Sequence, residues 1–279
     1  MSLTKETSEA FEKKAKTAVK IKQLSLRFFQ QRSKLPLRVL DDIDLEIRES
    51  EFISIVGPSG CGKTSILKIL GGITEPDDEN VELSGSVEID GMTTKQAKEA
   101  RLFGFAFQNP VLLPWRTVKE NVELPLEIAG YSGVDKTSRV SDLLELMDIQ
   151  HFAQSYPHEL SGGMQQRVNI ARALVHQPKF LLMDEPFGAL DEITREKLNV
   201  ALYELHRVKK TTIVFVTHSL REAVFLSNRI LVLSKRPAKI KALLESPLPA
   251  NRNEAMQSGQ SYLDFLSQVR RILFQEEAK

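Results

Sequence analysis

Two hydrophobic patterns run through this chain, and each predicts a different kind of element. Short, almost wholly apolar runs that end at a glycine or a polar residue predict buried strands, at Phe52–Val56, Phe180–Asp184, Ile213–Thr217 and Arg229–Ser234. Stretches with apolar residues every three or four positions predict helices, at Lys63–Leu70, Gly163–Val175 and Ile193–Val208. Strands and helices in alternation predict a parallel sheet covered on both faces.

A second group of strands has a different pattern. Apolar and polar residues alternate over Val19–Phe28 (with one slip), Ile43–Ile47 and Val87–Ile89. Such alternation is typical of antiparallel strands with one face in water, so we expect an antiparallel layer beside the parallel core. A polar, helix-compatible stretch at Thr93–Ala100 and a short apolar run at Phe103–Phe107 follow this layer.

The middle of the chain lacks strand patterns. Helical periodicity covers Val118–Ile128, Val140–Met147 and His151–Ala153 with no apolar run between them. We therefore expect a helical insertion over about residues 109–160 within one large domain at 19–245.

Both ends of the chain differ from this domain. Residues 1–18 mix lysines and glutamates with few apolar residues, which predicts a disordered or frayed tail. Residues 246–279 begin as a polar linker with Pro247 and Pro249 and end in a helical stripe of Tyr262, Phe265, Leu266, Val269, Ile272 and Leu273. The stripe predicts an amphipathic helix that packs on its own domain; a partner-binding helix is the alternative.

Composition excludes several classes of protein. With 279 residues and a net charge of +1, the chain is long enough for a full core and has no field that calls for nucleic acid. A single cysteine, Cys61, excludes an internal disulfide. No apolar run reaches the roughly eighteen residues that span a bilayer, and the N-terminus is charged where a signal peptide is apolar.

The loop between the first buried strand and its helix has the composition of a phosphate-binding loop. Its glycines allow positive φ and bring backbone N–H groups close to an anion at a helix N-terminus. Lys63 is placed to contact the β- and γ-phosphates of a nucleotide, and the Thr64 hydroxyl to bind Mg²⁺. The candidate nucleotide-binding residues here are Gly57, Pro58, Ser59, Gly60, Cys61, Gly62, Lys63, Thr64 and Ser65.

Two acids follow the strand Phe180–Asp184. Because open α/β sheets bind ligands at the carboxyl ends of their strands, Asp184 is expected near the Mg²⁺ and Glu185 beside the attacking water as its general base. No Gly-x-Ser-x-Gly motif for a hydrolytic nucleophile occurs, so the predicted chemistry is phosphoryl transfer to water.

The stretch 160–167, Leu-Ser-Gly-Gly-Met-Gln-Gln-Arg, is the most specific in the chain. Ser161, Gly162 and Gly163 lead into a helix with open N–H groups, which predicts a second anion site. These residues resemble the signature motif of ATP-binding cassette (ABC) ATPases, and the resemblance extends from about Val19 to Ile240.

The resemblance implies a P-loop NTPase fold with a RecA-like parallel core, an antiparallel β layer and a helical insertion. It implies that Ser161 and Gly163 bind the γ-phosphate held by the opposite subunit of a head-to-tail dimer. It also implies that Gln108 senses Mg²⁺ and the water, that His218 contacts the γ-phosphate, and that Phe28 stacks on adenine. Phe29 is an alternative for the adenine contact, and Phe28 also suits a core position on an edge strand. Ala189-Leu190-Asp191 is similar to the loop that meets its counterpart across the dimer, although Asp191 also suits a plain helix N-cap.

Two further segments are similar to the nitrate, sulfonate and taurine importer branch of this family. They are Leu-Leu-Pro-Trp at 112–115, followed by Val-x-x-Asn-Val, and Ser-Lys-Arg-Pro-Ala-Lys-Ile at 234–240, where alanine replaces the glycine of the branch. Trp115 is expected to face a membrane subunit, with burial in the helical insertion as the alternative.

By this resemblance the chain is an ATP- and Mg²⁺-dependent hydrolase that drives uptake of a small solute. A homodimer at the cytoplasmic face of the bacterial inner membrane would serve two permease subunits, contacted near Gln108–Val118, and indirectly a periplasmic or lipid-anchored solute-binding protein. Import of a thiamine precursor or another small organic molecule is one alternative. A soluble ABC ATPase that acts without a permease is the other.

Overall fold

The computed structural model describes residues 16–30, 33–76, 80–131 and 133–275. Most of the tail expected at 1–18 lies outside these residues. The first strand, β1 (Thr17–Gln30), starts two positions before the expected domain boundary at residue 19. No helix within the described ranges has the length and apolar character needed to cross a membrane.

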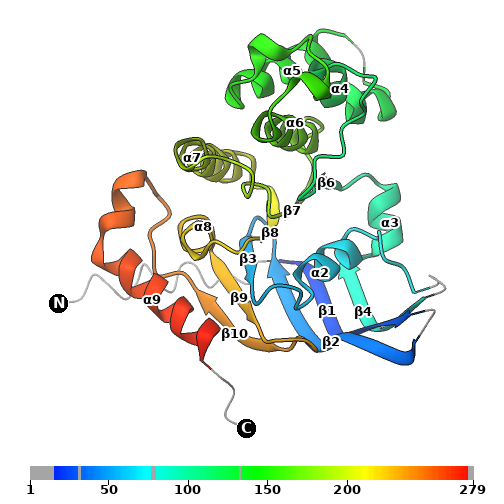
Figure 1. Ribbon diagram of the computed structural model, residues 1–279, viewed down its shortest axis with the longest axis vertical. Helices are drawn as coiled ribbons and strands as arrows, with labels where there is room; N and C mark the ends of the chain where they lie inside the picture. Colours follow the sequence, from blue (N-terminus) through cyan, green and yellow to red (C-terminus); the bar gives the residue numbers. More distant parts are fainter. Residues whose placement is uncertain (1–15, 31–32, 77–79, 132, 276–279) are drawn as a thin grey trace.

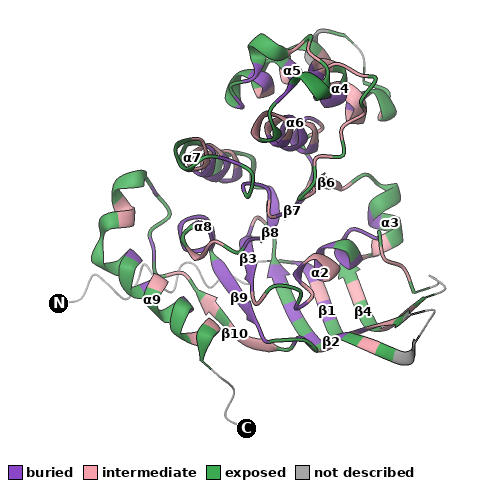
Figure 2. Ribbon diagram, in the orientation of Figure 1, coloured by how far each residue is buried: buried purple, intermediate pink, exposed green. Residues whose placement is uncertain are grey.

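A six-stranded sheet forms the centre of the molecule (Figure 1). Its strands run in the order β10 (Ile240–Glu245), β9 (Arg229–Leu233), β3 (Phe52–Val56), β8 (Thr212–Val216), β7 (Phe180–Asp184) and β6 (Phe103–Ala106). All neighbours pair in parallel except β10, which is antiparallel to β9. Every residue of β3, β7, β8 and β9 is buried, which accounts for their continuous apolar sequence (Figure 2).

The expected antiparallel layer is a second sheet. Its order is β2 (Ser33–Arg48), β1, β4 (Val81–Ile89) and β5 (Met92–Thr93). The slip in the apolar alternation of β1 coincides with a register shift between Ile21 and Leu24, where Gln23 has a φ of 49°. This irregular residue keeps Ile21 and Leu24 both buried although they are three positions apart.

Helices cover the central sheet and form the insertion. Helices α2 (Lys63–Leu70), α3 (Thr94–Glu99), α7 (Glu192–Lys209) and α8 (Leu220–Leu226) belong to the core. Helices α4 (Val118–Ile128), α5 (Val134–Leu146) and α6 (Gly162–Leu174), with 3₁₀ turns η1 (Gln150–Phe152) and η2 (Pro157–Glu159), group together at one end of the molecule (Figure 1). Thr117 begins α4 with a capping box that also uses Glu120.

The C-terminal helix packs on its own chain. Turn η3 (Glu254–Ser258) leads into α9 (Gln260–Phe274), which contacts α8, β9 and β10. Tyr262, Phe265 and Val269 are buried at this contact, so the amphipathic stripe faces the chain's own core. The Tyr262 hydroxyl donates a hydrogen bond to the Arg221 carbonyl at 3.0 Å.

Several elements differ from the sequence prediction, among them α8, which was not predicted, and the expected helix at 151–153, which is the 3₁₀ turn η1. Helix α5 begins at Val134, six positions before the expected start at Val140, because its first turns are polar and carry no apolar periodicity. Strand β10 was not predicted, since it is an edge strand with largely half-exposed residues and no clear alternation. The fold class itself, a P-loop cassette with a parallel core, an antiparallel layer and a helical insertion, is confirmed.

Candidate functional site

The phosphate-loop candidates form a tight turn between β3 and α2. Gly60 and Gly62 have φ of +70° and +124°, which favours glycine at both positions. A Cβ on Gly62 would also lie 2.9 Å from side-chain carbons of Val39 and Leu40. The Lys63 ammonium donates to the carbonyls of Gly57 and Pro58 at 3.0 and 3.1 Å, so this buried cation is held against the loop.

Cys61 is a packing residue within this loop. It is 1% exposed, and burial raises the pKa of its thiol, so the thiol stays protonated at neutral pH. A Cβ on Gly57 would lie 2.9 Å from the Cys61 sulfur, which shows how closely the two residues pack. Position 61 therefore holds a small buried side chain that packs within the loop.

Thr64 and Asp184 meet at the start of α2 and the end of β7. The Thr64 hydroxyl donates to Asp184 Oδ1 at 3.1 Å. Burial raises the pKa of the Asp184 carboxyl, the Thr64 hydrogen bond opposes that rise, and the charge of Glu185 adds to it. Within the described ranges no group of three or more His, Cys, Asp or Glu side chains is placed to bind a metal. A cation here would take one hydroxyl and one carboxylate from the chain and its other ligands from nucleotide and water.

Gln108, Glu185 and His218 come together at one edge of the sheet. Gln108 follows β6, Glu185 follows β7 and His218 follows β8, and these three strands are adjacent and parallel. Their carboxyl ends therefore meet. Gln108 Nε2 donates to Glu185 Oε2 at 3.2 Å, and His218 Nδ1 lies 3.2 Å from the same oxygen.

The backbone at Glu185 is in a left-handed conformation. Its φ is 46°, which is rare for a non-glycine residue, and its N–H donates to the Val216 carbonyl at 2.8 Å. Strained backbone of this kind concentrates at functional sites, where the surrounding structure holds it in place. The conformation turns the chain sharply after β7 and brings the carboxylate to Gln108 and His218.

Ser161, Gly162 and Gly163 form the exposed N-terminus of α6. The Ser161 hydroxyl caps the helix by accepting from Met164 N at 3.3 Å. A Cβ on Gly162 would meet nothing within 4 Å, and one on Gly163 would lie at ordinary contact distance, 3.5 Å, from Ala189 O and Leu190 Cδ2. Neither glycine has positive φ. Nothing in the described chain therefore requires glycine here, whereas a ligand that approaches the helix N-terminus would.

The structure does not join this helix end to the phosphate loop. Among the described residues, no hydrogen bond or ion pair links 161–163 to 57–65. The chain thus carries two candidate phosphate-binding elements that it does not itself connect.

Helix α6 contains functional contacts that sequence reasoning missed. Gln166 and Asn169 both donate to the Phe107 carbonyl, at 3.0 and 2.8 Å, and Arg172 donates to the Val111 carbonyl at 2.6 Å. These three polar side chains recur every three positions in a helix with many buried residues, and that spacing was the available signal. Through them, α6 holds the backbone on both sides of Gln108.

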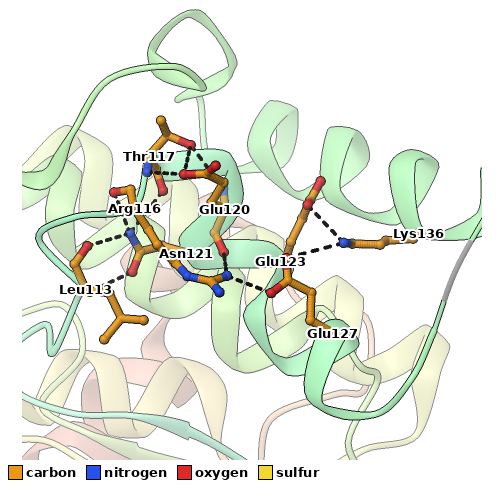
Figure 3. Close-up of polar contacts among 8 residues, drawn as sticks. All are labelled: Leu113, Arg116, Thr117, Glu120, Asn121, Glu123, Glu127 and Lys136. Carbon is orange, nitrogen blue, oxygen red and sulfur yellow. Dashed lines mark hydrogen bonds and ion pairs between the residues drawn. The ribbon is translucent and has the colours of Figure 1, made fainter.

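A buried asparagine fixes the loop that precedes α4 (Figure 3). Asn121 is fully buried; its Oδ1 accepts from Leu113 N at 2.8 Å, and its Nδ2 donates to the carbonyls of Leu113, Arg116 and Thr117 at 3.0–3.1 Å. Arg116 also pairs with Glu127 at 2.7 Å.

The loop held by Asn121 presents apolar side chains to solvent. Trp115 is 70% exposed and Val111 is 61% exposed. The alternative that Trp115 fills the core of the helical insertion is therefore wrong.

Phe28 lies on β1 and is half buried against the core between the antiparallel layer and α2. Its cross-strand neighbours are Leu37 and Val81. Phe29 is more exposed, at 42%. Adenine stacking by Phe28 remains a prediction. Asp191 caps α7 by accepting from Thr194 N at 3.0 Å, as the plain N-cap interpretation expects.

The chain is similar to known proteins over most of its length. The family described as "ABC transporter" matches residues 40–188. The aliphatic sulfonates import ATP-binding protein SsuB of Bacillus cereus is 41% identical over 235 residues, 84% of this chain and 88% of the relative. An uncharacterized ABC transporter ATP-binding protein of Methanocaldococcus jannaschii is 37% identical over 274 residues, 98% of each chain.

Solved structures show the same fold. A dimeric bacterial ABC transporter cassette superposes with a TM-score of 0.72 at 34% identity, covering 81% of this chain and 98% of the cassette. The same cassette in a post-hydrolysis state with ADP and Pi gives a TM-score of 0.69 at 35% identity, over 80% and 98% of the two chains.

Proposed function

This chain belongs to the ABC transporter family of ATP-binding proteins, and from that premise we propose that it powers uptake of a small anionic solute of the nitrate, sulfonate or taurine kind. The family and the hydrolysed nucleotide in the related cassette make the chain an ATP hydrolase. The observation that carries the proposal is the meeting of Gln108, Glu185 and His218 beside the Thr64–Asp184 contact.

The chain binds the phosphates of ATP with the loop between β3 and α2. Lys63 supplies a fixed positive charge, and the backbone N–H groups at the start of α2 supply donors. Thr64 and Asp184 offer the hard oxygen ligands that Mg²⁺ prefers, 3.1 Å apart. Mg²⁺ bound there would neutralise charge on the phosphate oxygens.

Glu185 is the proposed general base. Gln108 and His218 both contact Oε2, and the described residues make no contact with Oε1, so that oxygen is available to accept a proton from water. The two contacts fix the carboxylate plane. His218, whose side chain is 67% exposed, is also placed to donate to the γ-phosphate.

The second half of the proposed site comes from another copy of the chain. Ser161 and Gly163 present open N–H groups at the N-terminus of α6, and their own chain supplies no phosphate to them. A head-to-tail homodimer would bring this helix end to the γ-phosphate held by the neighbour's Lys63, and the related cassette is known as a dimer.

The proposed permease contact is the loop that Asn121 holds. Its exposed Trp115 and Val111 are apolar anchors of the kind that dominate protein interfaces. Two permease subunits above the dimer would place the chain at the cytoplasmic face of the cell membrane, with the solute held by an external binding protein. The ATPase does not contact the cargo, so the class of solute rests on the similarity to sulfonate import proteins.

The test is ATP hydrolysis by the complex purified from membranes and reconstituted in vesicles. With the binding protein present, taurine or a short alkanesulfonate should raise hydrolysis several-fold, and emission from Trp115, the only tryptophan, should shift to shorter wavelength on assembly. Stimulation by a thiamine precursor alone would replace the proposed solute. A chain that assembles with no membrane protein and hydrolyses ATP fully by itself would overturn the transport proposal.

A further inference from the structure

An ion pair outside the residues assigned above connects the two loops that carry Glu185 and His218. Glu222, in the first turn of α8, has a side chain only 7% exposed, and its Oε1 lies 3.6 Å from Nε of Arg195 on α7. Burying a carboxylate is unfavourable unless it is paired and hydrogen-bonded. The hydrogen bonds that Glu222 and Arg195 make therefore show which segments the pair holds.

The Glu222 side of the pair fixes the turn around His218. Its Oε2 accepts the Thr217 hydroxyl hydrogen at 2.5 Å, and that hydroxyl in turn accepts from Ser219 N at 2.9 Å. The Ser219 hydroxyl accepts from Glu222 N at 3.3 Å. Both neighbours of His218 in the sequence are thus hydrogen-bonded into one closed arrangement with Glu222.

The Arg195 side of the pair fixes the segment after Glu185. Arg195 Nη2 donates to the Leu190 carbonyl at 2.7 Å, and Nε lies 3.4 Å from the Phe187 carbonyl. Gly188 N donates back to the Glu185 carbonyl at 3.2 Å, so this segment and the strained Glu185 backbone form one turn.

We propose that the Arg195–Glu222 pair is a positioning device that sets the distance between the Glu185 and His218 loops for ATP hydrolysis. The proposal rests on the base and phosphate-contact roles proposed for Glu185 and His218. The Glu185 loop follows β7, and the His218 loop follows the neighbouring strand β8. The Arg195–Glu222 pair links the two loops. Misplacement of a reacting group by about 1 Å costs on the order of a hundredfold in rate, so a loosened bridge is expected to lower turnover.

The experiment is a double-mutant cycle on ATP hydrolysis by the purified full chain. Arg195→Gln and Glu222→Gln should each lower kcat about tenfold, with the KM for ATP within about twofold of wild type. The double variant should be no slower than the slower single variant, because either change already breaks the bridge. Arg195→Lys keeps the charge and should recover part of the loss.

Two substitutions at Thr217 test the proposal without a change of charge, in case the charge changes prevent folding. Thr217→Val removes the hydroxyl that Glu222 accepts and should lower kcat, whereas Thr217→Ser retains the hydroxyl and should not. The matched control is the exposed pair Glu204–Arg207 on the same helix α7, with its contact at 2.8 Å. Glu204→Gln should leave kcat unchanged.

The outcomes separate this proposal from the proposed function. Hydrolysis at the wild-type rate by Glu185→Gln would remove the base assignment and the positioning role with it. An inactive Glu185→Gln together with wild-type kcat in the Arg195 and Glu222 variants would refute the positioning role alone. Fully additive losses, or losses that follow only a lowered melting temperature, would also refute it.

Discussion

At the scale of single residues, the fold explains the identity of one glycine of the candidate site and does not explain that of two others. Gly62 needs its positive φ and the space beside Val39 and Leu40. Gly162 and Gly163 have neither constraint. The sequence identifies all three as glycines near a helix start, but only the structure shows that the described chain requires glycine at position 62 and not at 162 or 163.

Glu185→Gln tests the proposed base at this scale. The amide keeps the size and the contact with Gln108, but it cannot take a proton from water. We expect kcat for ATP hydrolysis to fall by a factor on the order of a hundred or more, with ATP affinity within about threefold of wild type. Steady-state hydrolysis and nucleotide titration measure the two quantities.

Lys63→Ala is the matched comparison, since it should weaken ATP binding itself by removing a charge-assisted contact. If Glu185→Gln turned over at the normal rate, or lost ATP binding as Lys63→Ala does, Glu185 would not be the base.

At the scale of elements, the order of the strands in the sheet brings the candidate site residues together. The sequence predicts each buried strand with the polar residue after it, at Gln108, Glu185 and His218. The pattern along the chain predicts neither that β6, β7 and β8, which are consecutive strands, pair with one another, nor that β3 lies out of chain order between β9 and β8. The convergence at Glu185 Oε2 was therefore available only from the assembled sheet.

The sequence pattern also does not predict which side chains hold which loops. Asn121 is the polar residue among the buried positions of α4, whose other buried residues are Val118, Val122 and Leu126. Its four hydrogen bonds to the 113–117 loop depend on how that loop folds back over α4. A polar residue at a buried helical position marks such a contact, but the pattern alone does not name the partner.

Asn121→Ala is expected to release this loop. The change leaves Leu113 N and the carbonyls without their side-chain partner, at a cost of about 2 kcal/mol in the free energy of unfolding. Because Trp115 is the only tryptophan, its fluorescence anisotropy reports directly on the loop and should fall. Chemical denaturation and anisotropy decay measure the two effects.

Hydrolysis by the isolated chain serves as the control in that experiment. It should stay within about twofold of wild type, since Asn121 contacts neither the phosphate loop nor Glu185 in the described structure. Wild-type anisotropy in the Asn121→Ala chain would mean that other contacts hold Trp115 in place.

At the scale of the whole molecule, the chain holds two candidate phosphate-binding elements that no hydrogen bond or ion pair of the described residues connects. The loop at Lys63 lies between β3 and α2 of the core, whereas Ser161 begins α6 in the helical group at the other side of the central sheet (Figure 1). On the proposed shared site, this separation means that one chain supplies only part of each catalytic site.

The most direct test of that account is the mass of the Glu185→Gln chain with and without ATP, measured by sedimentation. Without ATP we expect a particle of one 31.5 kDa chain, and with saturating ATP one of twice that mass. Adding Ser161→Arg to the same chain should keep it monomeric in ATP while its nucleotide affinity changes little. A Glu185→Gln chain that stays at the mass of one chain in saturating ATP would contradict the shared catalytic site.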